Sequence, residues 1–290
     1  MRRVLTVLGA LAGAVLGLAP AARAEPPVWI VRDADSEMLL FGSVHLLPPG
    51  LDWRPRALDA AIVAADDIWF ELDVGPEAER EVARLAAGAG VLPPGGSLLA
   101  MLEPEDQTRL IRMAGRLGVP MANLDRLEPW LAEVALATAA YAKAGATSAD
   151  GVEAQVAARL PEGLRRRALE TPAEQIGFFD GAPQDVQITS LTRTVAELET
   201  DPDGYLDLVR AWLAGDAQAL DREALQPLRE ASPDAFRRLV EARNIRWTAE
   251  LDARLKGAGR TVVVVGVGHL VGEGGVPERL RALGYSVTGP

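Results

Sequence analysis

The chain has 290 residues, of which 30 are basic and 41 acidic, and its net charge of −11 excludes the usual electrostatic basis for binding nucleic acid or anionic membranes. The sequence contains no cysteine, which excludes disulfides, a thiolate nucleophile and a lipid-modified cysteine. Because 49% of the residues are hydrophobic, a chain of this length can bury one large core.

The first 24 residues predict an export signal rather than a part of the fold. Arg2 and Arg3 give a positive start, residues 4–18 are apolar, and residues 22–24 form an Ala-Arg-Ala cleavage site. The apolar run is shorter than the roughly 20 residues that a membrane-spanning helix needs. We therefore expect a periplasmic or secreted protein, with residues 25–290 as one domain and no membrane span after cleavage.

The first elements expected after the signal are a β-hairpin and a helix. Residues 28–31 and 38–41 are apolar runs separated by a polar turn, and the motif Gly-x-x-His at residues 42–45 follows the second run at once. A helix is expected within residues 52–65, because Asp52 can cap its first turn and apolar residues recur at helical spacing.

A third strand is predicted at residues 68–73, with two acidic residues near its carboxyl end. Glu71 and Asp73 are two positions apart and would share one face of the strand. Asp73 fits a solvated strand end. Glu71 lies between two apolar residues, which makes it a candidate to face a site built around the histidines.

Residues 76–232 predict a mostly helical insertion that covers the sheet or forms a lid. Proline and glycine punctuate this region, and apolar residues recur at three- and four-residue steps. Glu170 follows a short apolar pair and is a further candidate for a carboxylate at a strand end. The spacing of Thr171 and Glu174 predicts a capping box at the start of the next helix.

The C-terminal region repeats the plan of the N-terminal region. A helix predicted over residues 233–256 precedes a strand of four valines, the motif Gly-x-x-His at residues 266–269, a Gly-rich loop, a helix over residues 276–283 and a strand at residues 285–287. This recurrence predicts an α/β fold whose central mixed sheet is built from two similar units of strand, Gly-x-x-His, helix and strand.

His45 and His269 are the only histidines of the chain, and both stand in this repeated context. Ligands of open α/β sheets bind in the crevice beyond the carboxyl ends of the strands. Gly42 and Gly266 allow the backbone to leave each strand sharply. We therefore expect the two imidazoles to converge in a reaction centre, where imidazole serves as a metal ligand or a general base.

Arg243 lies within the apolar stripe of the predicted helix over residues 233–256. A guanidinium keeps its charge, so burial at this position demands an acidic partner such as Glu71 or a bound anion. The alternative is a packed stem with its charged head in water. Asn244, beside it, is a further candidate for the same site.

Several familiar cofactor and catalytic motifs are excluded. The Gly-rich run at residues 266–272 does not form a dinucleotide-binding loop, because Val271 stands at the position of the third glycine and no helix is predicted to begin there. The sequence also lacks the H-E-x-x-H, G-x-S-x-G and EF-hand patterns.

The chain resembles the TraB/GumN family, whose relatives include the TIKI proteases. The resemblance spans almost all of residues 25–290 and is carried by residues 40–50, 71–73, 150–153, 169–175, 243–247 and 265–272. It implies an α/β fold of the erythromycin-esterase/ChaN-like type, with paired Gly-x-x-His motifs and acidic residues at a proposed active site. TIKI relatives are described as metal-dependent peptidases.

We therefore predict an exported, metal-dependent hydrolase that acts on a peptide or amide bond in a peptide or small-molecule substrate. His45 and His269 would bind a divalent ion such as Zn²⁺, Mn²⁺ or Co²⁺ together with a carboxylate, either Glu71 or Glu170. The ion would lower the pKa of a bound water, and the carboxylate not used as a ligand would move its proton.

Arg243, with Asn244 beside it, would then hold a substrate carboxylate or the developing oxyanion. Three alternatives stay open. A metal-free hydrolase could use His45 or His269 as the base for ester hydrolysis. The same crevice could bind haem or another small ligand without turnover, or the protein could be a non-catalytic accessory in envelope or polysaccharide assembly.

Overall fold

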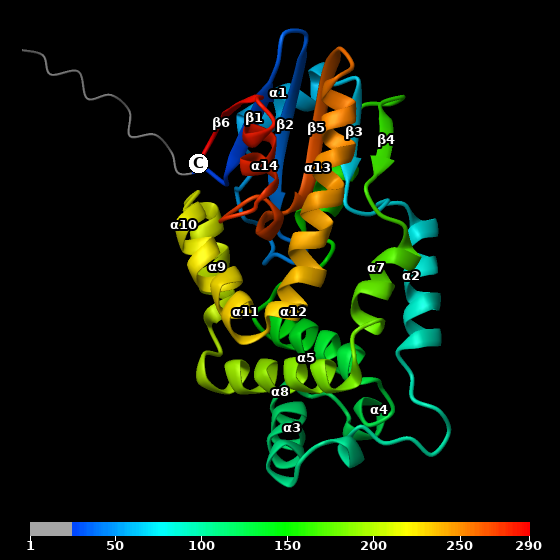
Figure 1. Cartoon of the computed structure of the whole chain (residues 1–290). Helices are drawn as coiled ribbons and strands as arrows, with labels where there is room; N and C mark the ends of the chain where they lie inside the picture. Colours follow the sequence, from blue (N-terminus) through cyan, green and yellow to red (C-terminus); the bar gives the residue numbers. More distant parts are fainter. Residues whose placement is uncertain (1–24) are drawn as a thin grey trace, which may run out of the picture.

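The computed structural model describes residues 25–290, and its centre is a six-stranded mixed β-sheet (Figure 1). The predicted export signal, residues 1–24, lies outside the described residues. The strands are β1 Val28–Arg32, β2 Ser36–Ser43, β3 Asp67–Phe70, β4 Arg165–Ala168, β5 Gly259–Gly266 and β6 Ser286–Thr288, in the spatial order β4-β3-β5-β2-β1-β6.

Four neighbouring strands of this sheet are parallel. β5 pairs in parallel with β2 on one side and with β3 on the other, and β3 pairs in parallel with β4. β1 is antiparallel to both β2 and β6, which confirms the predicted hairpin and the mixed sheet of an α/β fold. Because parallel strands share one direction, the residues that follow β2, β5, β3 and β4 meet at one edge of the sheet.

The strand β5, near the centre of the sheet, is apolar and is buried along most of its length. Val262, Val263, Val264 and Val265 are each at most 1% exposed. A strand that is covered on both faces consists of consecutive apolar residues, and the sequence of β5 shows this pattern. The flanking helices are α1 Arg56–Ala64, α13 Ala242–Leu255 and α14 Val276–Ala282.

Most of the chain between β3 and α13 is helical. Its helices are α2 Pro76–Ala89, α3 Pro104–Leu117, α4 Met121–Leu124, α5 Pro129–Lys143, α6 Val152–Ala157, α7 Pro172–Asp180, α8 Gln184–Thr200, α9 Gly204–Leu213, α10 Ala217–Leu220, α11 Gln226–Ala231 and α12 Pro233–Phe236. In Figure 1, α5 and α8 cross below the sheet, and α3 lies beyond them. None of the helices within residues 25–290 is both long and apolar enough to span a membrane.

The helical region has an apolar core of its own, separate from that of the sheet. Leu110 and Met113 of α3, Leu136 of α5 and Leu191 of α8 are almost completely buried in this second core. The predicted capping box at the start of α7 is also present, since Thr171 and Glu174 bond reciprocally to each other's backbone N–H groups.

Several element boundaries differ from the predicted ones; β2, for example, extends over Ser36–Ser43 rather than residues 38–41. β3 ends at Phe70, the last residue that pairs with both β4 and β5, so Glu71 is the first residue beyond the strand. The helix expected within residues 52–65 begins at Arg56, with Pro55 at its cap position. The long helix predicted from residue 233 contains a wider, π-helical turn at Arg237–Glu241 before α13 begins.

β4 is a strand that the sequence pattern does not predict, although Glu170 follows it as a carboxylate at a strand end, as expected. Its four residues, Arg165–Ala168, are all exposed and three of them are arginines. β4 is an edge strand held by backbone pairing to β3, and charged residues are common at such edges. An exposed, charged strand has no apolar alternation for a pattern search to detect.

Candidate active site

The parallel strands bring four predicted site residues to one edge of the sheet. His45 follows β2 and His269 follows β5, while Glu71 and Glu170 follow β3 and β4. A backbone hydrogen bond of 2.8 Å from the Glu170 N–H to the Glu71 carbonyl continues the β3–β4 pairing beyond the strands. Helix α13 supplies Arg243 to the same place.

Gly266 lies between the two imidazoles. A Cβ atom at this position would be 3.8 Å from Nε2 of His45 and 3.8 Å from Cδ2 of His269. It would also be 2.9 Å from Oε1 of Glu71, closer than real Cβ atoms come to a neighbour. The two rings and the carboxylate therefore surround one small space, which glycine leaves open.

His269 is buried, and its ring orientation is fixed from α13. Its Nδ1 is 2.7 Å from Oδ1 of Asn244, and the Asn244 amide donates to the carbonyl of Gly274 at 3.0 Å. Because a carbonyl only accepts, this second bond directs Oδ1 toward the ring, so Nδ1 carries the proton and Nε2 has the free lone pair. The ring also packs against Trp247, with 4.3 Å between ring centroids.

Burial lowers the pKa of His269 to about 4, although the nearby charge of Glu71 acts in the opposite direction. The ring is therefore neutral at physiological pH. Its Nε2 lies 3.8 Å from Oε1 of Glu71.

His45 has the opposite electrostatic setting. Its Nδ1 is 2.8 Å from Oε1 of Glu153, and the same oxygen accepts a 2.5 Å hydrogen bond from the Ser43 hydroxyl. The negative charge of Glu153 raises the pKa of His45 to about 9. The His45 side chain is 60% exposed, so it lies at the open side of the site and water screens part of this attraction.

Glu153 belongs to residues 150–153, one of the segments that carry the family resemblance, and the fold places it beside His45. It lies in the first turn of α6, directly after Gly151 and Val152. The Val152 N–H donates to the Val44 carbonyl, and a Cβ at Gly151 would be only 2.0 Å from the His45 carbonyl oxygen. This close approach of the two backbones places the Glu153 carboxylate beside the His45 ring. No local sequence pattern predicts this contact.

Glu71 is a buried carboxylate that stays ionised. Burial alone would raise its pKa, but the positive charges of His269 when protonated, Arg243 and His45 outweigh burial and lower the pKa to about 2. Oε1 accepts a 2.5 Å hydrogen bond from the Gly266 N–H, and Oε2 accepts one of 3.0 Å from Arg243.

Arg243 is buried, and each of its three guanidinium nitrogens donates a hydrogen bond to the protein. Its Nε donates to Oε1 of Glu170 at 2.7 Å, and its Nη2 donates to Glu170 at 2.9 Å and to Glu71 at 3.0 Å. Nη1 donates to the carbonyl of Leu239 at 3.0 Å. The guanidinium therefore has the acidic partners that its burial requires, and two of them are Glu71 and Glu170.

Glu170 forms the far side of this charge cluster. Its side chain is fully buried, and burial raises its pKa despite the hydrogen bonds from Arg243. Arg246 also donates a hydrogen bond of 3.0 Å to Glu170. A second hydrogen bond joins Arg246 to Glu174 in the first turn of α7. The sequence does not indicate this role for Arg246, because its position on the helix resembles that of any surface arginine.

The donor chemistry of the site suits a divalent ion. Each ring is held through Nδ1 by an oxygen of Glu153 or Asn244, which is how the hydrogen-bonding partners of metal-binding histidines typically orient them, and this leaves Nε2 to face the site. Nε2 of His269 has a free lone pair, whereas the raised pKa of His45 keeps that ring protonated near neutral pH, so a metal ion would have to displace its Nε2 proton. Glu71 offers the carboxylate. Within residues 25–290, however, no three such side chains lie close enough together to form a ready ligand cluster, so binding would require them to draw together.

Comparisons with known proteins identify one family. Residues 27–289 match the TraB/PrgY/gumN family, and this match covers nearly the whole chain. No curated protein and no solved structure matches the chain.

Proposed function

The chain belongs to the TraB/PrgY/gumN family, and from this membership together with the strand-end cluster we propose that it is an exported hydrolase of peptide or amide bonds. The observation that carries the proposal is the convergence of the two imidazoles and the Glu71 carboxylate around Gly266. Buried ionisable groups with strongly shifted pKa values are concentrated at functional sites.

The proposed enzyme is metal-dependent. His45 and His269 would hold the divalent ion, Zn²⁺, Mn²⁺ or Co²⁺, through their Nε2 atoms, with Glu71 as the third ligand. When bound, such an ion supplies Lewis-acid chemistry and lowers the pKa of water.

The remaining side chains of the proposed site act by positioning. Asn244 keeps the proton of His269 on Nδ1, and Glu153 orients His45 through its own Nδ1. Arg243, braced by Glu170, keeps Glu71 ionised and fixed in place. Such partners typically contribute roughly 10- to 100-fold in metal affinity or activity.

A metal-free hydrolase is the second candidate, and a specific observation favours it. Glu71 already accepts hydrogen bonds from Arg243 and the Gly266 N–H, which leaves it less free to serve as a ligand. His269 presents an unprotonated Nε2 toward the same space, which is the atom that a general base requires. In this version His269 takes the proton of the attacking water, while Arg243 again holds Glu71.

The test is to measure metal content and peptide hydrolysis in protein purified without chelator. We expect stoichiometric divalent metal in the wild type, loss of metal and activity in His45→Ala and His269→Ala with an unchanged circular dichroism spectrum, and retention of both in Asp73→Asn. Asp73 is the matched control, because it is an exposed acid beside the site.

Other results would select a different function. Chelator-resistant hydrolysis that disappears in His269→Ala would support the metal-free enzyme. A Soret absorbance lost in the histidine variants would support haem binding. Absence of both metal and hydrolysis in the wild type would contradict the proposal.

A further inference from the structure

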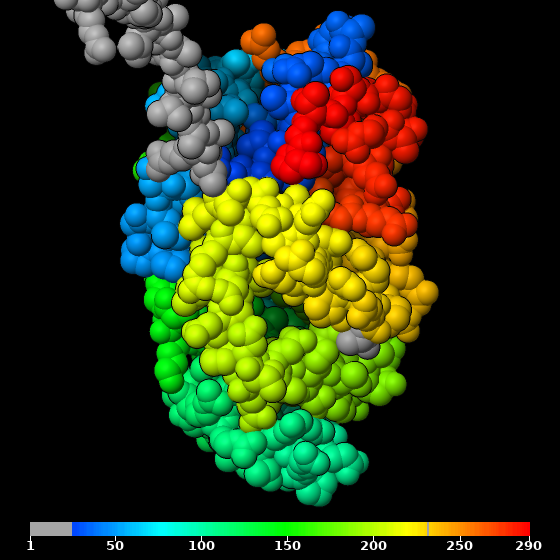
Figure 2. Space-filling view, turned by 90° about the vertical axis from the view of Figure 1, so that its left-hand side faces the viewer, coloured from blue at the N-terminus to red at the C-terminus, as the bar shows by residue number. Residues whose placement is uncertain are grey.

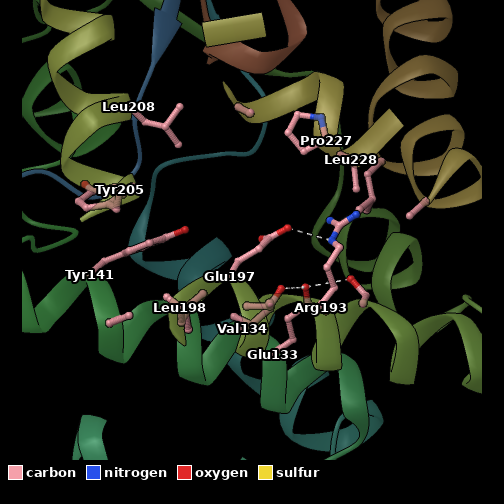
Figure 3. A pocket seen from close by; sticks show the side chains of 18 of the residues that line it. Glu133, Val134, Tyr141, Arg193, Glu197, Leu198, Tyr205, Leu208, Pro227 and Leu228 are labelled. Carbon is pink, nitrogen blue, oxygen red and sulfur yellow. Dashed lines mark hydrogen bonds and ion pairs between the residues drawn. The ribbon is translucent and has the colours of Figure 1, made fainter. Parts of the chain in front are cut away.

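A cavity of about 990 Å³ lies in the helical layer, beside the candidate active site. Helices α5, α7, α8 and α9 contribute most of its wall, together with the chain around residues 223–239. Figure 2 shows it as a hollow between the helices, and Figure 3 shows the side chains that line it. Its size is at the upper end of the range for small-ligand pockets, which is roughly 300–1,000 Å³.

The cavity borders the active site on two sides. Phe178 and Leu239 line the cavity, and both contact Arg243: the guanidinium carbon lies 5.2 Å from the centroid of the Phe178 ring, and the Leu239 carbonyl accepts from Nη1. Tyr205 also lines the cavity, and its hydroxyl donates to the carbonyl of Leu46, the residue after His45. The cavity therefore adjoins residues that contact the candidate site, whereas His45, Glu71 and His269 are not among the residues that line it.

The cavity walls combine aromatic and aliphatic side chains with charged ones. The charged side chains among the described residues are Arg193 and Arg238 and the acids Glu133, Glu197, Asp201, Asp207 and Glu223, so Arg193 is one of two cations that could offset a ligand's negative charge there. Tyr141 stacks on Tyr205 with 4.1 Å between ring centroids, and Trp130 stacks on Phe179 with 6.0 Å. Leucine side chains lie among these rings, as Figure 3 shows for Leu198. Such walls fit the apolar side chains of a ligand.

One guanidinium in the cavity wall has a buried nitrogen without a hydrogen-bond partner in the described part of the chain, although it also forms an ion pair. Arg193 of α8 has its Nε 3.2 Å from Oε1 of Glu197, but its Nη1 is buried and has no hydrogen-bond partner among the described residues. The nearby carboxylate of Glu133 is engaged instead by the hydroxyls of Ser190 and Thr194 (Figure 3). A buried donor without an acceptor is costly, so this guanidinium is suited to an anionic oxygen supplied by a ligand.

We propose that this cavity is the substrate-binding chamber of the enzyme, that its walls hold the apolar side chains of a short peptide, and that Arg193 binds the terminal carboxylate of that peptide. The inference rests on the proposed function for the identity of the occupant as a substrate. Binding itself requires only the chamber and Arg193.

The test compares two probes by isothermal titration calorimetry: N-acetyl-Ala-Leu-Phe with a free terminal carboxylate, and the same peptide with a terminal amide. We expect the wild type to bind the carboxylate roughly tenfold more tightly, as for a charged hydrogen bond. Arg193→Gln should remove this preference and leave the amide affinity unchanged, whereas Arg193→Lys should retain part of it. Arg112→Gln, which changes an exposed arginine of α3, should behave as wild type.

A second variant tests the chamber. Ala137 lines the cavity, so Ala137→Phe should fill part of it and weaken the binding of both probes. Equal wild-type affinity for the two probes, or a preference that survives in Arg193→Gln, would overturn the assignment of Arg193. Unchanged binding in a folded Ala137→Phe protein would overturn the chamber.

His269→Ala separates this inference from the proposed function. We expect it to lose hydrolysis and keep the carboxylate preference. If the wild type hydrolyses no peptide but shows an Arg193-dependent preference, the proposed function fails and the binding chamber stands. If the wild type hydrolyses peptides without any such preference, the inference about Arg193 fails alone.

Discussion

At the scale of single residues, the two histidines of the site differ in their surroundings although they share a sequence motif. His269 is buried against Trp247 with an uncharged amide at Nδ1, whereas His45 is exposed with a carboxylate at the same ring atom. Burial favours the neutral ring and the carboxylate favours the charged one, so the pKa values of the two histidines move apart. The glycine between them keeps both rings near Glu71.

The space around Gly266 can be tested by adding one methyl group. In Gly266→Ala the new Cβ would be 2.9 Å from Oε1 of Glu71, so the carboxylate must shift. We expect a stability loss of about 1–3 kcal/mol from overpacking. If the chain has the hydrolytic activity that we propose, we also expect that activity to fall by roughly 10- to 100-fold because the site is misplaced. Thermal unfolding and peptide hydrolysis assays measure the two effects.

Gly268→Ala is the matched control in the same loop. Its Cβ would be 3.2 Å from the flexible end of Leu225, which can move aside. Equal activity in the two variants would show that the space beside Glu71 is not needed.

At the scale of elements, α13 joins the site to the opposite end of the sheet. Arg243 and Asn244 near its start hold Glu71 and His269, while Arg254 near its end donates to Asp67, the first residue of β3. Thr261 of β5 donates to the same carboxylate at 2.8 Å. The helix is thus bonded to the strands at both ends, which fixes the position of its site residues.

The Asp67 contact predicts a pH-dependent contribution to stability. Burial alone would raise the pKa of Asp67, but hydrogen bonds from Arg254 and Thr261 outweigh it and hold the pKa below its usual 3.8. Because the folded-state pKa is the lower one, the anion stabilises the fold above the unfolded-state pKa, and this contribution disappears as the pH falls through the folded-state value.

We therefore expect Asp67→Asn to lower the free energy of unfolding by roughly 1–3 kcal/mol near neutral pH. The difference from wild type should shrink as the pH falls below 3.8. Urea unfolding at a series of pH values measures it. Asp35→Asn, at an exposed position of the β1–β2 turn, should follow the wild type throughout. A difference between wild type and Asp67→Asn that does not vary with pH would contradict a role for the anion.

At the scale of the whole molecule, the chain has two apolar cores with the substrate chamber of our proposal in the helical layer. The first core surrounds β5, and the second is enclosed by α3, α5 and α8. Figure 1 shows the sheet above and these helices below. Separate cores allow the two parts to open independently, as cooperative subregions of proteins often do.

Cavity-forming substitutions in each core test this independence. Leu136→Ala in α5 and Val263→Ala in β5 remove fully buried side chains, and Leu136→Ala should cost about 2–5 kcal/mol. We expect Leu136→Ala to speed amide hydrogen exchange in α3, α5 and α8 while β5 keeps its protection, and Val263→Ala to do the reverse. Equal loss of protection in both parts would show that the fold opens as one unit.

The local sequence was sufficient to predict the elements with strong patterns. The valine run of β5, the β1–β2 hairpin and the capping box of Thr171 and Glu174 depend on short-range periodicity and turn chemistry, so the sequence determined them. The edge strand β4 and the early end of β3 depend on backbone pairing between distant segments, which leaves no apolar pattern to read.

For the site, the sequence by itself determined which groups are available: two histidines in a repeated motif, the acids after strands and an arginine in an apolar stripe. Only the tertiary structure decided their partners. Glu153 reaches His45 across 108 positions and Arg243 reaches Glu71 across 172, because parallel pairing and a close backbone approach at Gly151 bring these segments together. Charge and burial then act over a few ångströms in space, whatever the distance along the chain.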